Sequence, residues 1–401
     1  MSCEQLTARR RQLARPRPLP AGAATVVYAT NSTGFTGAEE SLCHLVQHLD
    51  QSRYRAVALV PFEGYLADRL RFAGAEVHCF GHSFFENTTE DFLAVAHSLQ
   101  RFSPHLVHIE CMPGLPLSMT LPLLGIPSVQ HLRIARLGLV ADQIRSSDAI
   151  IAVSEYVRNR ALRLNVDAEN VHVVWNGIDL ERFRPGVFDK DEMRREFSIS
   201  AGAKVVLCVG RFVPSKRQDL LVSAFRKLRE RVPDSVLVFA GDAGDAAFTQ
   251  QVGEQVRACG LNGAVRFLSF QKDIRRIEAA ADVMVLCSRR EPLARCVLEG
   301  LAMGIPCVVN ESGGMTEIIS DGANGLVVAS DNEVPLADRV GDLLLHPEVA
   351  ARLAHNGRAF AEQHLSAAVY ARKVMGIYDQ VLHRQNSLQT DNAQRNEVYA
   401  Q

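Results

Sequence analysis

The sequence predicts an α/β protein with two domains in tandem, each built on a parallel sheet covered by helices on both faces. Its length of 401 residues suggests more than one domain. Short apolar runs alternate with amphipathic stretches, which is the pattern of buried parallel strands separated by helices. This alternation pauses once, in the charged residues 182–203, and then resumes.

The first domain is predicted from five apolar or β-branched runs. After the first run, Leu42, Leu45, Val46 and Leu49 recur at the spacing of one apolar helix face. The runs that we expect to form buried strands are Thr25–Ala29, Val57–Val60, Leu106–Ile109, Ala149–Val153 and Val171–Val174.

The second domain repeats the pattern. An amphipathic helix with an apolar face from Leu220 to Leu228 follows its first strand. The predicted strands are Val205–Val209, Val236–Ala240, Val265–Leu268, Val283–Leu286 and Cys307–Val309. We therefore divide the chain into a first domain at 24–184, a linker at 185–203 that contains Pro185, and a second domain at 204–366.

The two ends of the chain differ from the domains. Residues 1–23 hold five arginines and three prolines without apolar periodicity, so we expect a disordered basic tail. A basic arm that touches anionic lipid or an acidic partner is the alternative. Residues 385–401 are rich in Gln and Asn, and we expect a second disordered tail there.

Composition excludes several classes of protein. Lys plus Arg total 44 against 45 for Asp plus Glu, so the chain has no nucleic-acid-binding footprint. The nine cysteines are scattered, without the spacing of a zinc site, and we expect reduced core residues of a cytoplasmic protein. No apolar stretch reaches the roughly 20 residues that span a bilayer, and no secretory signal is visible.

The strongest local signal follows the predicted strand Val283–Leu286. Pro292 suits the first position of a helix, so residues 292–294 would offer free backbone N–H groups to an anion. Glu291 precedes this helix start, and Glu299 lies about 12 Å further along the helix. Carboxylates on both sides of an anion site fit a nucleotide sugar, which carries hydroxyls on both sides of a diphosphate. Two surface glutamates on a helix would give the same pattern.

A second signal follows the strand Val205–Val209. Gly210 permits a sharp exit from the strand, and Arg211 and Lys216 then stand at its carboxyl end, where phosphates are commonly held. Each charge-assisted bond to phosphate contributes about 1.5–3 kcal/mol. Solvated charge in a loop is the alternative interpretation.

A third signal follows the first predicted strand. Residues 31–39 open a helix and include Gly37, which would let a ligand approach the backbone closely. A generic strand-to-helix turn explains the same residues. The P-loop, the dinucleotide-binding G-x-G-x-x-G and H-E-x-x-H are all missing.

Taken in order, these segments resemble the retaining glycosyltransferases of family 4 over residues 24–380. The Glu-x7-Glu motif corresponds to Glu291 and Glu299. The other matching segments are 37–40 (GAEE), 148–155 (DAIIAVSE), 174–179 (VWNGID), 209–211 (VGR) with Lys216, 304–306 (GIP), 313–317 (GGMTE) and 324–325 (NG).

The resemblance implies the GT-B fold, two Rossmann-like domains facing across a cleft. It implies that the second domain binds a nucleotide-sugar donor, by family frequency a UDP-sugar, and that the first faces a glycan, lipid-linked or small-molecule acceptor. A helix at 367–384 would cross back to the first domain. No obligatory metal or other cofactor is expected. Peripheral contact with the inner membrane face through the basic tail fits a lipid-linked acceptor.

The resemblance also assigns roles to the charged residues. Arg211 and Lys216 would bind the diphosphate and stabilise the negative charge of the leaving group. Glu299 would bind the ribose hydroxyls, and Glu291 would contact the donor sugar.

Further expected donor contacts are the backbone amides of Leu293 and Ala294, with Gly37 leaving room for the diphosphate. His131 ends a predicted strand at 127–131 and is a candidate for contact with the donor sugar; a hydrogen-bonded histidine at a strand end is the alternative. The family often has Glu-Gly-Phe-Gly where this chain has 291–294 (EPLA). That departure affects the expected sugar pocket.

Other functions remain compatible with the pattern. A sugar-nucleotide epimerase or a phosphorylase has a similar architecture, although no lysine in a pyridoxal phosphate context is recognisable. A non-enzymatic, degenerate partner subunit would be expected to have lost Arg211, Lys216, Glu291 or Glu299. All four are present, which favours an active enzyme.

Overall fold

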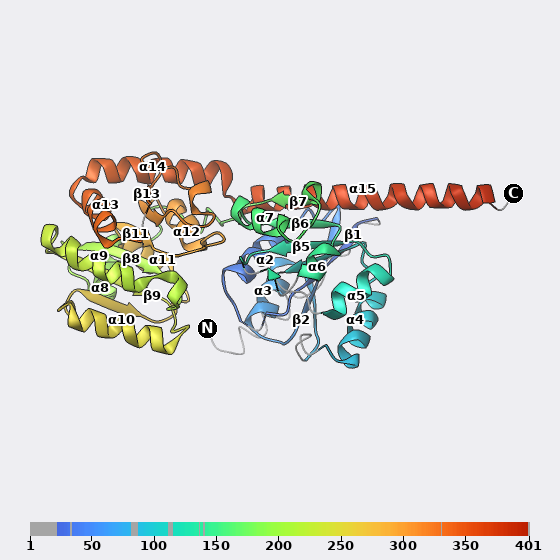
Figure 1. Ribbon diagram of the computed structural model, residues 1–401, viewed down its shortest axis with the longest axis horizontal. Coiled ribbons are helices and arrows are strands. Elements are labelled where there is room, and N and C mark those ends of the chain that lie inside the picture. The colour runs from blue at the N-terminus through green and yellow to red at the C-terminus, as the bar shows by residue number, and fades with distance from the viewer. Residues whose placement is uncertain are drawn as a thin grey trace. The chain divides into compact units, whose positions relative to one another are not determined.

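The structure is a computed structural model that describes residues 22–32, 34–81, 87–110, 115–135, 137–138, 141–329 and 331–399. It separates into two compact units (Figure 1). Unit 1 contains residues 1–177 and 367–401, and unit 2 contains residues 178–366. Each unit has its own parallel sheet with interleaved helices, which confirms the predicted fold class of two Rossmann-like α/β domains.

Unit 1 has a seven-stranded sheet in the order β3-β2-β1-β4-β5-β6-β7. Its strands are β1 (Ala24–Ala29), β2 (Tyr54–Val60), β3 (Glu76–Cys79), β4 (Leu106–Glu110), β5 (Ser128–Leu132), β6 (Ala149–Ala152) and β7 (Val171–Val173). Its α-helices before residue 177, among the described residues, are α2 (Gly37–Gln47), α3 (Tyr65–Ala73), α4 (Thr89–Phe102), α5 (Leu115–Leu123), α6 (Ala141–Arg145) and α7 (Glu155–Leu162).

Both faces of this sheet are buried, as continuous apolar strands predict. Along β1, Val26 and Tyr28 join a core with α2 and α3, whereas Val27 and Ala29 join a second core with α4 and α5. Successive side chains of a strand point to opposite faces, so a run without polar residues fills both cores.

The last helix, α15 (Ala367–Tyr399), belongs to unit 1 (Figure 1). Tyr370, Val374, Tyr378 and Val381 recur on one helix face and pack into the core that also contains α2. The disordered tail predicted at 385–401 is wrong for the residues up to Tyr399, which continue this helix. Residues 385–401 contain no proline or glycine, so the helix has no local reason to end there.

Unit 2 has a six-stranded sheet in the order β10-β9-β8-β11-β12-β13. Its strands are β8 (Lys204–Val209), β9 (Ser235–Ala240), β10 (Val265–Leu268), β11 (Val283–Leu286), β12 (Cys307–Asn310) and β13 (Leu326–Val328). Its α-helices are α8 (Lys190–Glu196), α9 (Gln218–Arg231), α10 (Ala246–Ala258), α11 (Arg275–Ala280), α12 (Arg295–Ala302), α13 (Glu333–Leu345) and α14 (Pro347–His364).

The predicted linker at 185–203 is part of unit 2, and the division between the units falls at residues 177 and 178 instead of 184 and 185. The segment contains α8, whose Arg194 is buried. Its guanidinium donates to the Ala280 carbonyl at 3.2 Å and to the Asp282 carboxylate at 2.7 Å. These bonds attach the charged segment to unit 2. The high content of charged residues at 185–203 was therefore not evidence of a linker.

Most of the basic tail predicted at 1–23 lies outside the described residues. None of the helices in the described ranges is both long and apolar enough to cross a membrane.

Candidate functional site

Two of the predicted donor residues meet at the carboxyl ends of β8 and β11. The Lys216 ammonium donates to the Glu291 carboxylate with an Nζ to Oε2 distance of 2.6 Å. These residues are 75 positions apart in the sequence. They meet because β8 and β11 are neighbouring parallel strands, whose carboxyl ends lie at the same edge of the sheet.

The pair is partly shielded from water, with side chains 24% and 11% exposed. Burial lowers the pKa of the Lys216 ammonium, but the adjacent Glu291 carboxylate outweighs burial and raises it above its usual value. Lys216 therefore keeps its positive charge at neutral pH, and Glu291 holds that charge at the strand end.

The loop between β8 and α9 also carries Gly210 and Arg211. The Gly210 amide donates to the Ala240 carbonyl at 2.9 Å, and a Cβ at Gly210 would lie 3.7 Å from Cδ and Cε of the Lys216 side chain. Arg211 is exposed, and its guanidinium makes no hydrogen bond or ion pair within the described ranges. By contrast, Arg217 in the same loop is already paired with two aspartates, so Arg211 is the cation that is free to meet a phosphate.

Helix α12 begins at Arg295, not at the predicted Pro292. Residues 292–294 precede the helix in non-helical conformation, and Ala294 is its N-cap, with extended backbone at φ −78° and ψ 115°. The Ala294 amide faces the Met315 sulfur at 3.3 Å, a weak acceptor, while the Leu293 amide has no acceptor among the described residues. The Leu293 amide is therefore the better placed of the two to donate to an anion.

The segment after β12 explains the later helix start. Its Gly314 amide donates to the Glu291 carbonyl at 2.8 Å, and the Ser312 hydroxyl accepts from the Arg290 amide at 2.6 Å. Gly313 has φ +69°, and a Cβ there would lie 1.8 Å from the Glu291 carbonyl oxygen. Only glycine permits this approach. The sequence showed these residues as a family segment, but gave no sign of their contact with Glu291.

Glu299 lies within α12 and is paired with Arg295, with an Nε to Oε1 distance of 2.8 Å and side chains 10% and 11% exposed. Cys296, in the first turn of α12, lies within electrostatic reach of the predicted groups: burial raises the pKa of its thiol, and the charges of Lys216, Glu299 and Glu291 all act on it. The first turn of α12 thus gathers three of the four predicted charged residues.

The remaining two candidates lie in unit 1. Gly37 is the first residue of α2, which is capped by Thr36 and Glu39 in a reciprocal capping box. The Thr36 hydroxyl donates to the Glu39 carboxylate at 2.6 Å. The predicted turn is therefore a well-defined helix start.

His131 is buried within a polar network, with no exposed surface. Its Nδ1 lies 3.3 Å from both the His108 Nε2 and the Arg133 Nη2. Burial, with Arg133 adding to it, lowers the pKa of the imidazole well below its usual value, so the ring is neutral. His131 is thus a hydrogen-bonded histidine at the end of β5, as the alternative interpretation expects, and its contact with the donor sugar stays a prediction.

His108, Glu110 and His131 offer ligand atoms within 4.8 Å of one another. The two Glu110 oxygens, however, accept from the Arg133 Nε at 2.7 Å and Nη2 at 2.9 Å. Because a guanidinium cation already holds both oxygens, the group fits an ion pair and not a metal centre.

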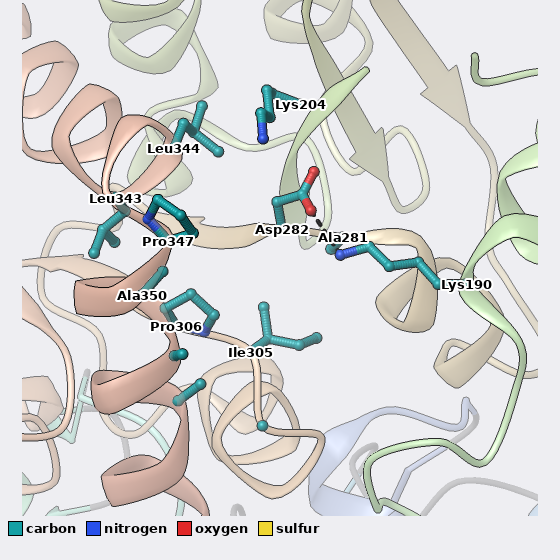
Figure 2. Close-up of a pocket in the computed structure, with 13 residues that line it drawn as sticks. Lys190, Lys204, Ala281, Asp282, Ile305, Pro306, Leu343, Leu344, Pro347 and Ala350 are labelled. Atoms are coloured by element: carbon teal, nitrogen blue, oxygen red, sulfur yellow. Dashed lines mark hydrogen bonds and ion pairs between the residues drawn. The ribbon is translucent and has the colours of Figure 1, made fainter. Parts of the chain in front are cut away.

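A hollow of about 230 Å³ lies elsewhere on unit 2 (Figure 2). Its lining includes Lys204, Asp282 and Pro306, which stand at the amino ends of β8, β11 and β12. Asp282 is held there by Lys190 at 2.6 Å. The predicted donor residues follow the carboxyl ends of the same strands, so this hollow is at the opposite edge of the sheet and is not the predicted site.

Two family models match the chain: Glycosyltransferase Family 4 over residues 35–182 and Glycosyl transferases group 1 over residues 189–360. The lipopolysaccharide core biosynthesis mannosyltransferase LpsB of Rhizobium meliloti is 30% identical over 244 residues, which are 60% of this chain and 67% of that protein. The GDP-mannose-dependent alpha-(1-6)-phosphatidylinositol monomannoside mannosyltransferase of Mycolicibacterium smegmatis is 31% identical over 227 residues, 54% and 58% of the two chains.

Spore coat protein SA of Bacillus subtilis is 31% identical over 253 residues, 59% of this chain and 66% of that protein. The chain thus spans between about half and two thirds of the length of the curated relatives that it matches.

Among solved structures, Anabaena HepE in complex with UDP and glucose superposes with a TM-score of 0.80 at 21% identity, over 89% of this chain and 100% of that one. A glycosyltransferase from Rickettsia africae gives 0.79 at 18% identity, over 90% and 99%. These similarities show a shared fold.

Proposed function

The chain belongs to the GT-B glycosyltransferases of the family 4 type, and from that membership we propose that it transfers a hexose-type sugar from a nucleotide-sugar donor, a UDP-sugar, to a glycan, lipid-linked or small-molecule acceptor with retention of anomeric configuration. The observation that carries the proposal is the Lys216–Glu291 ion pair at the carboxyl ends of the neighbouring strands β8 and β11. Arg211 lies in the same loop as Lys216, and its guanidinium makes no hydrogen bond or ion pair within the described ranges.

In this reaction the bond between the sugar C1 and the diphosphate oxygen breaks, and a bond from C1 to the acceptor oxygen forms. Negative charge develops on the departing diphosphate, and the proton of the acceptor hydroxyl passes to an oxygen of that diphosphate. Arg211 and Lys216 supply fixed positive charge for that diphosphate. A lysine ammonium has three protons, so the bond to Glu291 leaves two for phosphate oxygens.

The remaining roles follow from the order of the residues along α12. The Leu293 amide donates to a phosphate or sugar oxygen, Glu291 accepts from a hydroxyl of the donor sugar, and Glu299 accepts from the ribose hydroxyls. The basic residues and the start of α12 serve the diphosphate without an obligatory metal. The roles of Gly37 and His131 toward the donor stay predictions.

The comparisons support two donor classes to different degrees. HepE structures contain UDP with glucose and UDP-glucose, whereas the name of one curated relative specifies GDP-mannose. Family frequency and the HepE complexes favour uridine, so UDP-sugars are the first donors to test.

A thermal-shift panel of UDP, GDP, ADP and their common sugar derivatives tests the donor site. A ligand at 100 times its Kd stabilises the protein by about 2.7 kcal/mol, which raises Tm by roughly 5–10 °C for a domain of this size. Arg211→Ala should weaken binding by about 10–150-fold, the loss of one charge-assisted phosphate bond. Arg226→Ala, at an exposed position on α9, is the matched control and should bind normally.

Stabilisation by one nucleotide class that is reduced in Arg211→Ala and kept in Arg226→Ala would support the assignment. Stabilisation by none of these ligands would favour a degenerate partner subunit. The anomeric configuration of a transferred sugar, read by NMR from the one-bond coupling at C1, tests retention; an inverted product would refute it.

A further inference from the structure

Glu278 in α11 is a buried carboxyl that the proposed mechanism does not use. The residue has no exposed surface, and neither of its carboxyl oxygens has a hydrogen-bond partner within the described part of the chain. Most buried polar groups are paired, and an unpaired buried carboxylate is costly. The group is therefore held in its neutral, protonated form in this conformation.

The charges around Glu278 belong largely to the nucleotide site. Burial raises the pKa of the Glu278 carboxyl well above its usual range, and Glu299 raises it further. Arg295 lowers it, followed by smaller effects of Asp273, which raises it, and Arg275, which lowers it. Two carboxyl groups thus lie within the influence of one guanidinium, and in this conformation Arg295 is bonded to Glu299 at 2.8 Å.

The other charged groups near Glu278, on its own segment and on α8, form ion pairs with one another. Arg275 is bonded to Asp273 at 2.5 Å on the same segment. From α8, which packs on α11, Arg194 is bonded to Asp282, and Glu196 is bonded to Arg276. Cys307 of β12 also lies within electrostatic reach, and burial raises the pKa of its thiol, so it stays neutral. Of the two cations that act on Glu278, Arg295 is the one whose present partner, Glu299, is a predicted ligand contact.

We propose that Glu278 is a positioning residue of the nucleotide site: when the donor binds, Arg295 leaves the Glu299 carboxylate and pairs with the Glu278 carboxylate instead. As the ribose hydroxyls engage Glu299, Arg295 turns to Glu278, the O–H bond of the Glu278 carboxyl breaks, and its proton passes to solvent. No other bond changes. The inference rests on the proposed function, because it takes Glu299 as the ribose ligand.

The exchange has a thermodynamic consequence. If one proton leaves on binding, the association constant rises up to tenfold for each pH unit, over the range in which Glu278 is protonated in the free protein. A buried carboxyl that only fills space would leave the pH dependence of binding unchanged. The proton count on binding therefore separates the two roles.

Isothermal titration calorimetry of the full chain with UDP-glucose measures this count. Titrations at pH 7.5 in buffers of different ionisation enthalpy give the number of protons released as the slope of observed heat against buffer enthalpy. UDP-glucose is suitable because its diphosphate diester has no group that titrates near neutral pH. The wild-type protein should release close to one proton.

Two variants test the origin of that proton. Glu278→Gln keeps the shape of the neutral carboxyl and should bind UDP-glucose with no proton release. Arg295→Met removes the exchanged cation and should also abolish release, whereas Glu254→Gln, an exposed control on α10, should match the wild type.

A wild-type slope of zero, or equal release from Glu278→Gln and the wild type, would overturn the exchange while leaving the donor site intact. Failure of the wild-type protein to bind either UDP-glucose or GDP-mannose would instead reject the proposed donor function, and the exchange with it.

Discussion

Replacing Arg133 with methionine should destabilise unit 1 strongly. Arg133 and Glu110 both have side chains that are 4% exposed, and the guanidinium holds both oxygens of the Glu110 carboxylate. The same guanidinium donates to the Tyr370 hydroxyl of α15 at 2.8 Å and bonds the Asn176 side chain. The substitution therefore strands a buried carboxylate and removes a bond between the sheet and the last helix.

The expected magnitude follows from the stranded charge. Removing one partner of a buried ion pair costs about 3–5 kcal/mol, because the remaining charge has lost its compensation. With an m-value of about 3 kcal/mol/M for a unit of this size, the urea midpoint should fall by roughly 1–2 M.

Fluorescence of the single tryptophan reports on this unit alone. Trp175 lies in unit 1, and the Lys373 ammonium of α15 sits 5.8 Å from its ring centroid. Urea titrations followed by this fluorescence therefore measure the unfolding of unit 1 and the release of α15, without a signal from unit 2.

The double variant Arg133→Met with Glu110→Gln separates lost charge from lost packing. Because the stranded carboxylate is gone, it should recover more than half of the loss caused by Arg133→Met alone. A loss below about 1 kcal/mol in the single variant would refute the reasoning, as would strictly additive effects in the double variant.

The destabilisation caused by Arg133→Met should also depend on pH in a predictable direction. Burial raises the pKa of the Glu110 carboxyl, but the charge and hydrogen bonds of the Arg133 guanidinium outweigh burial and bring this pKa well below the usual range. A carboxyl with a depressed folded-state pKa contributes stability above its unfolded pKa of about 4.3, and this contribution disappears as pH falls toward the folded value. In Arg133→Met the Glu110 carboxyl stays buried without its guanidinium, which raises its pKa, so protonation relieves the stranded charge between pH 7 and about 4. The difference between wild type and Arg133→Met should therefore shrink as pH is lowered from 7 toward 4, and should shrink further below about 4.3 as the wild type loses its own contribution.

Three further predictions concern the site and the last helix. Gly313→Ala should cost about 1–3 kcal/mol and weaken UDP-glucose binding in calorimetry, because its Cβ would lie 1.8 Å from the Glu291 carbonyl oxygen. Gly322→Ala, where φ is also positive but nothing lies within 4 Å, is its control and should leave binding unchanged. Glu291→Gln should keep UDP affinity within about threefold and lower kcat by about 100-fold or more, the loss of roughly 3 kcal/mol from the transition state; normal turnover would remove Glu291 from the site. Gly177→Ala should loosen α15, seen as faster hydrogen exchange in that helix, because its Cβ would lie 2.8 Å from both the Ala367 Cα and the Tyr370 Cβ; unchanged exchange would contradict that packing.

The sequence by itself predicted both sheets and most of their strands. Central strands such as β1 and β8 are buried on both faces, so they appear as uninterrupted apolar runs. The strands that the sequence did not predict carry weaker signals. β3 lies at a sheet edge and includes Glu76 and His78, and β13 has only three residues.

Parts of the candidate site were also visible in the sequence. The glycine and the basic residues after β8, and the two glutamates eight positions apart, are local features of the chain. The order of the strands then brought Lys216 to Glu291, as the shared carboxyl edge of a parallel sheet requires.

The rest depended on contacts between residues far apart in the sequence. The segment around Gly313 sets the start of α12 at Arg295. Arg133 and the return of α15 to unit 1 together bury His131. Glu278 carries no local sign of burial, since a lone glutamate on a short helix is ordinarily a surface residue. Local patterns record periodicity and helix or strand propensity, whereas burial, charge compensation and helix boundaries at a site are decided by which distant segments the sheet order brings together.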